Sequence, residues 1–264
     1  MQIHGQSAAE ASGLFAEIEA ELSRLENIFS LYRPNSEIAR LNLDGFLDHP
    51  SPDLLNVLSL CKSIYQASEG AFDPTVQPLW LALANGAGAT ETARARGAVG
   101  FDRLRFGPER VSFETRDAPV PPALTLNGIA QGAITDRIAG LLRARGLKNA
   151  LIDIGEIAAL GHRPGGAPWR VGIAEPGGAV LKKVTLSDRA IATSSTRSET
   201  LGSLQSHIIN PKIPGETAEF TISVSAPHAA MADGLSTALC AAPEHSVDGL
   251  LSKFPGTRLE LQHA

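Results

Sequence analysis

The sequence predicts an α+β fold, because helical periodicity dominates its first part and short strands dominate its second. Apolar residues recur at steps of three and four over residues 8–31 and 52–68, which indicates two amphipathic helices. From residue 100 onward, short apolar runs alternate with turn-forming residues, and helices are interspersed among them. This order favours mixed or antiparallel sheets flanked by helices over a regular strand–helix alternation.

The boundaries of the early helices follow from their capping residues. Pro34 disfavours helix at the residue before it and so ends the first helix. Ser36 can cap a short helix that runs through Leu41. The helix over 52–68 is expected to end at Gly70, where a glycine suits a left-handed cap.

The second part of the chain is expected to hold mostly strands. Residues 103–106 and 110–113 can pair as a hairpin around Gly107-Pro108. Helices are expected over 133–145 and 229–242. The remaining strands are expected at 124–126, 150–154, 169–173, 184–186, 190–193, 207–209, 220–225 and 258–261. With no repeat or low-complexity linker in view, a single domain over residues 1–264 is favoured.

Composition excludes several classes of protein. Hydrophobic residues make up 43% of the 264 residues and charged residues 19%, which is enough apolar material for a core. The net charge of −5, without a basic run, argues against a nucleic-acid partner. An anionic small ligand stays open, since a helix N-terminus or a metal can hold phosphate.

No apolar run is long enough to cross a membrane, and the first residues lack an export signal, so the chain as written is expected to be cytoplasmic. A true start farther upstream would make a periplasmic location possible. Cys61 and Cys240 are far apart in the sequence and could bond only if the fold brought them together; we expect two buried thiols.

The common catalytic signatures are missing, but five polar segments interrupt the apolar pattern. The sequence has no phosphate-binding GxxxxGK[ST] loop, no GxSxG elbow and no HExxH zinc motif. The first polar segment runs from Tyr32 to Asn42 and can also be an ordinary link between helices. The second, residues 70–80, holds two prolines and an aromatic pair, which predicts a rigid extended path along a pocket.

The third and fourth segments suggest phosphate binding and proton transfer. The turn from Asn127 to Gly132 lets backbone N–H groups approach an anion at a helix start. In the fourth, residues 206–211, His207 on a strand beside a stiff turn is a plausible general base. The alternative for any single histidine is a surface or core-edge position.

The fifth segment suggests a magnesium site. On a helix, Asp233 and Thr237 share a face because they are four residues apart, and Ser236 lies beside them. A carboxylate with hydroxyl groups is a donor set that suits Mg²⁺, which takes few protein ligands. A solvated polar stripe is the alternative.

Together these segments resemble one family, the ApbE family of FAD:protein FMN transferases. The resemblance spans about residues 8 to 240. It is carried, in order, by the segments FSLYRPNSEIARLN, GAFDPTVQPLW, LNGIAQGAITDRIAGLL, NALIDIGEIAALG, PWRVGIAEP, AIATSS, SHIINP and ADGLSTAL.

The resemblance implies an enzyme that binds FAD and Mg²⁺ and joins FMN to a Ser or Thr hydroxyl of a target protein, with release of AMP. It implies His207 as the catalytic base. It implies a metal site at Ala130, through its carbonyl, and at Asp233, Ser236 and Thr237. It implies that FAD is bound by Tyr32, Ser36, Asn42, Ala71, Phe72, Asp73, Gly128, Gln131 and Ala133, the first three around the flavin and residues 71–73 at the adenosine end.

The chain departs from the family pattern at several positions. Gln131 stands where Lys is usual, and Glu156 takes the acidic place after one glycine rather than two. Thr196-Arg197 replaces a Gly-Asp/Asn step, and the family's first strand is short or absent. Two alternatives therefore stay open: a catalytically degenerate FAD-binding protein, or a Mg²⁺-dependent FAD pyrophosphatase.

Overall fold

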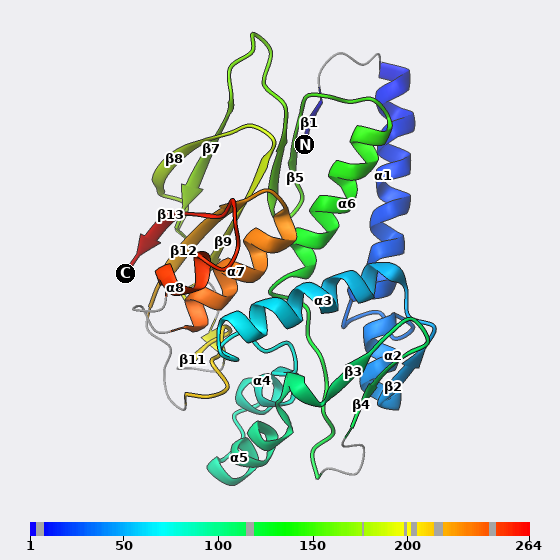
Figure 1. Ribbon diagram of the computed structural model, residues 1–264, viewed down its shortest axis with the longest axis vertical. Helices are drawn as coiled ribbons and strands as arrows, with labels where there is room; N and C mark the ends of the chain where they lie inside the picture. Colours follow the sequence, from blue (N-terminus) through cyan, green and yellow to red (C-terminus); the bar gives the residue numbers. More distant parts are fainter. Residues whose placement is uncertain are drawn as a thin grey trace.

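A six-stranded antiparallel sheet, in the order β1-β5-β6-β9-β12-β13, forms the centre of the computed structural model (Figure 1). Its strands are β1 (Gln2–Ile3), β5 (Ala150–Asp153), β6 (Ile157–Leu160), β9 (Arg189–Ser195), β12 (Thr221–Ala226) and β13 (Arg258–His263). The structure describes residues 1–3, 8–114, 119–175, 177–197, 200–201, 205–213, 219–242 and 247–264. The predicted α+β class is confirmed.

The two faces of this sheet are covered differently. Alternate residues of a strand point to opposite faces. Ala158 and Leu160 of β6 therefore pack with α6 (Ala130–Ala144) and α1 (Ala8–Phe29), whereas Ala159 packs against a hairpin of β7 (Trp169–Ala174) and β8 (Val180–Leu186). Helix α7 (Ala229–Ala241) also lies on the sheet, beside α6 (Figure 1).

Helices α2, α4 and α5 and a small sheet form the other end of the molecule, with α3 between the two ends (Figure 1). A three-stranded antiparallel sheet has the order β2-β4-β3. These elements are α2 (Glu37–Asp44), β2 (Phe46–Asp48), α3 (Pro52–Ala67), α4 (Gln77–Ala84), α5 (Ala89–Ala98), the 3₁₀ turn Phe101–Arg103, β3 (Leu104–Phe106) and β4 (Arg110–Phe113). Two short strands, β10 (Thr200–Leu201) and β11 (Gln205–Ser206), and helix α8 (Val247–Leu251) complete the described elements.

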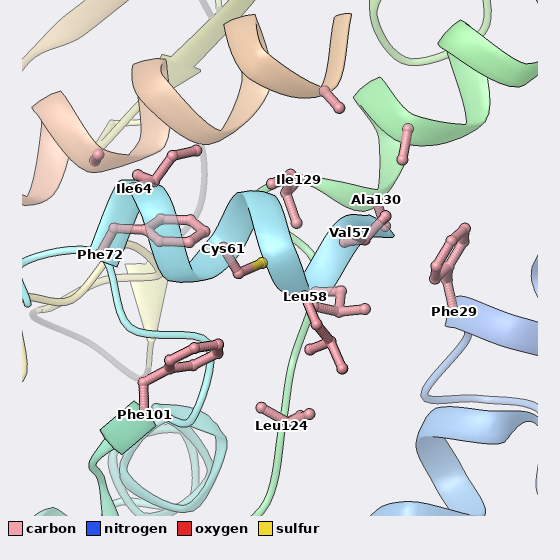
Figure 2. Packing of buried hydrophobic residues seen from close by; sticks show 14 of the residues in the cluster. Phe29, Val57, Leu58, Cys61, Ile64, Phe72, Phe101, Leu124, Ile129 and Ala130 are labelled. Atoms are coloured by element: carbon pink, nitrogen blue, oxygen red, sulfur yellow. The ribbon is translucent and has the colours of Figure 1, made fainter. Parts of the chain in front are cut away.

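Helix α3 joins the two ends through a shared core. Figure 2 shows Cys61 on the side of α3 that faces Phe101, and Ile64 on the side that faces α7. Ile129, the residue before α6, packs on that second side as well. A Cβ on Gly234 of α7 would lie 2.5 Å from Cδ1 of Ile64, so only glycine allows this approach. Helix α3 therefore packs closely on α7 at this position.

Most predicted elements are confirmed, including the first three helices, the hairpin of β3 and β4, and α7. Cys61 and Cys240 are both buried and free, as expected. None of the described helices has the length and apolar character needed to cross a membrane. Helix α6 begins at Ala130, three residues earlier than expected, because the turn is already closed by Ala130 donating to the Leu126 carbonyl.

Two predicted strands are wrong. Residues 124–126 form no strand, because the N–H and C=O groups of Leu124 bond to the side-chain amide of Asn42 instead of a neighbouring strand. His207–Ile209 is a bend that follows β11, in which the Ile208 N–H donates to Ser206 Oγ at 3.1 Å.

The extended path expected over residues 70–80 is also wrong in its second half. Helix α4 begins at Gln77 with Pro78 in its first turn, a position that proline tolerates because its missing N–H has no helical partner there. Helices α4 and α5 were not predicted, and neither was strand β6.

Candidate active site

All five polar segments contribute to the wall of one cavity of about 580 Å³. The cavity lies between the loop after α3, the start of α6, strand β9 and helix α7. The predicted site residues in its wall are Tyr32, Ala71, Phe72, Asp73, Gly128, Gln131, His207, Asp233 and Thr237. Segments separated by up to 200 residues thus meet around one volume, within the range of small-molecule sites.

Asp233 is the most deeply buried carboxylate of the cavity. It lies on α7 with 4% of its surface exposed, which excludes a solvated polar stripe. Its Oδ2 accepts a hydrogen bond from the backbone N–H of Gly132 at 3.0 Å. Burial raises the pKa of Asp233, because a charged group loses hydration there, and the Gly132 bond opposes the shift.

Glu156, which follows β5, supplies a second buried carboxylate to the same cavity. Burial raises its pKa above the usual range, and the charge of Asp233 raises it further. A backbone hydrogen bond from Thr193 works in the opposite direction. Two buried carboxylates in one cavity, both with a raised pKa, favour a bound cation, which would stabilise their charged forms.

The donor set fits Mg²⁺ better than a transition metal. Among the described residues, no three or more His, Cys, Asp or Glu side chains are grouped so that they could hold a metal ion. The cavity instead offers hard oxygens, from Asp233 and Glu156 and from the hydroxyls of Thr237 and Ser194. Mg²⁺ uses one or two carboxylates and keeps water or phosphate in its other positions, so these residues suffice.

The turn before α6 closely approaches the end of this donor set. A Cβ on Gly128 would lie 2.8 Å from Cγ2 and 3.1 Å from Oγ1 of Thr237, so any side chain there would displace Thr237. Ala130 and Ala133 are almost fully buried in the core behind the turn, and neither contributes to the cavity wall in the described part of the chain.

Asp136 fixes the start of α7 relative to α6. Its two carboxylate oxygens accept the N–H groups of Ala229 and Ala230 at 2.7 and 2.9 Å. These are first-turn N–H groups of α7, which have no partner within their own helix. A residue of α6 therefore caps α7 and holds Asp233 one turn farther along.

Asp73 lines the cavity, but its oxygens are already engaged. Oδ1 accepts from the N–H and the hydroxyl of Thr75 at 2.8 and 2.6 Å, and Oδ2 accepts from the Phe101 N–H at 3.2 Å. Burial raises the pKa of Asp73 despite these bonds. Its carboxylate pins the loop after α3 to the 3₁₀ turn. Ala71 and Phe72 of the same loop also line the cavity, although both are largely buried.

Tyr32 is the most accessible part of the wall, with 88% of its surface exposed. The neighbouring Arg33 fixes the segment to α1 by donating to the Ser23 carbonyl at 3.2 Å and to Asn27 Oδ1 at 2.9 Å. Ser36 is fully buried as the N-cap of α2 and accepts from the Ala39 N–H.

Ser36 and Asn42 lie beside the cavity rather than among its described lining residues. Asn42 holds the backbone of Leu124 through two hydrogen bonds of 2.7 and 2.8 Å. Ser36 thus caps α2 and Asn42 holds Leu124, and none of these residues belongs to the described cavity wall.

The cavity wall is acidic. Its described lining residues include the carboxylates Asp73, Glu156 and Asp233 and no Lys or Arg. Gln131 lines the cavity close to Gly155, whose φ of +114° is confined to glycine. An anionic ligand would therefore meet no fixed cation among these side chains.

Two polar cavity residues that could serve as ligands, Glu156 and Ser194, were not among the predicted site residues. Glu156 was noticed in the sequence as the acidic residue after Gly155, but no site role was assigned to it. Ser194 lies in a run of small residues on β9, and its sequence gives no sign that its hydroxyl faces α7.

Comparison with known proteins gives one consistent result. The ApbE family matches the chain over residues 1–259. An FAD:protein FMN transferase from Haemophilus influenzae is 29% identical, over 89% of this chain and 74% of its own length. One from Vibrio cholerae is 30% identical, over 88% of this chain and 74% of its own length.

Solved structures show the same relationship. The flavin transferase ApbE from Vibrio cholerae superimposes with a TM-score of 0.78 and 26% identity, over 94% of this chain and 84% of its own. The apo form of the Pseudomonas stutzeri flavinyl transferase ApbE gives a TM-score of 0.78 and 27% identity, over 96% and 81%.

Proposed function

The chain belongs to the ApbE family, and on that premise we propose that it is a Mg²⁺-dependent FAD:protein FMN transferase. Its substrates would be FAD and a Ser or Thr hydroxyl of an acceptor protein, and its second product would be AMP. The observation that carries the proposal is the convergence of five polar segments on one cavity with a buried carboxylate pair.

The carboxylate pair gives the reaction its cation site. Asp233 and Glu156, with the Thr237 hydroxyl, would hold Mg²⁺, which when bound draws negative charge from the pyrophosphate of FAD. No Lys or Arg among the described lining residues could do this in its place. The proposal therefore makes binding of the dinucleotide's phosphates strictly dependent on the ion.

The cavity offers different surfaces to the two ends of FAD. Tyr32 presents an aromatic face next to Leu31 at its accessible side, which suits the flavin ring. Ala71 and Phe72 offer an apolar surface on the loop after α3, and this surface suits adenosine. The backbone at Gly128, beside Thr237, lies between these surfaces in the proposed arrangement, close to the phosphates.

His207 is the candidate general base. It lies on the bend after β11 and lines the cavity together with the next two residues, Ile208 and Ile209. In the proposed step, the acceptor hydroxyl oxygen attacks the flavin-side phosphorus and His207 takes the hydroxyl proton. The P–O bond to the bridging oxygen breaks, and AMP leaves with that oxygen.

A direct assay tests this function. The protein is incubated with FAD, Mg²⁺ and a flavin-acceptor protein, and the acceptor is examined for covalent flavin fluorescence after denaturing electrophoresis. A fluorescent band that requires Mg²⁺ supports the proposal. AMP release at the same rate without acceptor would instead identify a pyrophosphatase, and FAD binding without either product would identify a non-catalytic relative.

A further inference from the structure

Three hydroxyl groups connect strand β9 to helix α7 at the cavity wall. Ser194 Oγ lies 2.8 Å from Ser236 Oγ and 3.2 Å from Thr237 Oγ1. Ser236 Oγ donates in turn to the carbonyl oxygen of Asp233 at 3.0 Å. Ser194 and Thr237 line the cavity, whereas Ser236 is fully buried.

The carbonyl at the end of this row fixes the direction of every bond in it. A hydroxyl has one hydrogen to donate, and a carbonyl oxygen can only accept. Because Ser236 gives its hydrogen to the Asp233 carbonyl, Ser194 must be the donor in its bond to Ser236. Ser194 then has no hydrogen left, so Thr237 must be the donor in the bond between Ser194 and Thr237.

This direction determines what Thr237 offers to the cavity. With its hydrogen committed to Ser194, Thr237 Oγ1 can present only lone pairs elsewhere. An oxygen that only accepts, on the same face of α7 as the Asp233 carboxylate, is a suitable ligand for a hard cation. With the opposite direction, Thr237 would point its hydrogen into the cavity and repel a cation.

We propose that Ser194 is a positioning residue that orients the Thr237 hydroxyl as a neutral ligand for the divalent cation. This inference rests on the proposed function for the identity of the ion. Ser194 itself needs no contact with the ion, because it acts through the hydrogen that it accepts from Thr237. Outer partners of this kind tune the ligands that they hold.

Two further contacts hold the participants in register. The Cys240 thiol on α7 donates to the backbone carbonyl of Ser194 at 3.4 Å, which ties β9 to α7 one turn beyond Thr237. Gly128 approaches Thr237 so closely that a Cβ there would lie 2.8 Å from Thr237 Cγ2. Gly128 thus packs directly against the Thr237 side chain.

Calorimetric titration of Mg²⁺ alone into the metal-free, full-length protein tests the inference without any turnover. Ser194→Ala removes the acceptor for the Thr237 hydrogen, and the Kd for Mg²⁺ should rise about tenfold. Ser194→Thr keeps a hydroxyl and should restore the affinity. Ser236→Ala frees the Ser194 hydrogen to turn toward Thr237, so the affinity should fall although Ser236 lies outside the described cavity wall.

Ser225→Ala is the matched control. Ser225 is a fully buried serine on β12 whose Oγ donates to Glu260 Oε1 at 2.7 Å, and neither residue belongs to the described cavity wall. This variant loses a similar hydrogen bond and should keep the wild-type affinity.

Two results would overturn the inference, and they are distinguishable. Wild-type affinity in both Ser194→Ala and Ser236→Ala would refute the positioning role alone. Equal Mg²⁺ binding by the wild type and Asp233→Ala would refute the cation site, and with it the proposed function.

Discussion

The backbone N–H of Gly132 donates to Oδ2 of Asp233 at 3.0 Å, and this contact depends on a close approach between α6 and α7. A Cβ on Gly132 would lie 2.4 Å from the carbonyl oxygen of Ala229. Backbone atoms cannot yield as a flexible side chain can, so α7 would have to move. The position of the buried carboxylate is therefore set by a glycine on the neighbouring helix.

Gly132→Ala should consequently destabilise the protein by about 1–3 kcal/mol or more and weaken Mg²⁺ binding. Urea denaturation and Mg²⁺ titration check the two effects. Gly140→Ala is the matched control, since Gly140 lies on the same helix and a Cβ there meets no atom within 4 Å. That control should be neutral or slightly stabilising because alanine favours helix. Wild-type Mg²⁺ affinity in Gly132→Ala would contradict the account.

Asp136→Ala should cost about 1–2 kcal/mol, because it removes the acceptors for two N–H groups at the start of α7. Asp136→Asn keeps one acceptor oxygen, so its free energy of unfolding should fall by less than that of Asp136→Ala. Chemical denaturation gives both values. Equal losses in the two variants would show that capping of α7 is not the role of this carboxylate.

Burial and the charge of Asp233 raise the pKa of Glu156, so the metal-free fold holds a proton that the unfolded chain releases. The contribution of this proton to stability is complete below the pKa that Glu156 has in the unfolded chain, about 4.3. It is lost as the pH rises toward the pKa that Glu156 has in the folded protein. The free energy of unfolding in EDTA should therefore fall between about pH 5 and about pH 8.

Glu156→Gln removes this titration and should make that decline shallower. Denaturation of both proteins at the two pH values, in the same buffer series, measures the difference. Added Mg²⁺ should offset the loss in the wild type but less so in the variant. Parallel pH dependence of the two proteins without metal would contradict the assignment of a raised pKa to Glu156.

His207→Ala should lower the rate of FMN transfer by about 10²–10⁴-fold, which is the usual contribution of a general base. FAD binding should change little, because the proton transfer occurs only in the reacting complex. Single-turnover kinetics with saturating FAD and a fluorescence titration of FAD separate the two. A large loss of FAD affinity with an unchanged rate at saturation would assign His207 to binding instead.

Local signals in the sequence were sufficient for much of the fold. The periodicity of α1 and α3 and the cap at Ser36 predicted those helices within a few residues. The strand predicted over residues 124–126 is wrong because the backbone of Leu124 bonds to the side chain of Asn42, 82 residues away. No local sequence pattern indicates such a long-range contact. The extended path predicted over residues 70–80 is wrong in its second half because Pro78 suits both an extended path and the first turn of a helix.

The site was predicted unevenly for a related reason. Motif resemblance pointed to segments that meet at the cavity, and nine of the predicted residues line it. It could not separate residues that line the cavity, such as Thr237, from buried residues outside its described wall, such as Ser36 and Ser236. That distinction depends on which hydrogen bonds each side chain makes in the folded chain. The Ser194 hydroxyl was not predicted because its hydrogen-bond partners are two residues of α7 more than 40 positions away in the sequence.

Mass spectrometry of an acceptor protein, after incubation with FAD and Mg²⁺, tests the central claim most directly. The account predicts that one Ser or Thr of the acceptor gains the mass of FMN less one water, and that Asp233→Ala abolishes this gain while the variant remains folded. Full modification by Asp233→Ala, or an unmodified acceptor with folded wild-type protein, would contradict it.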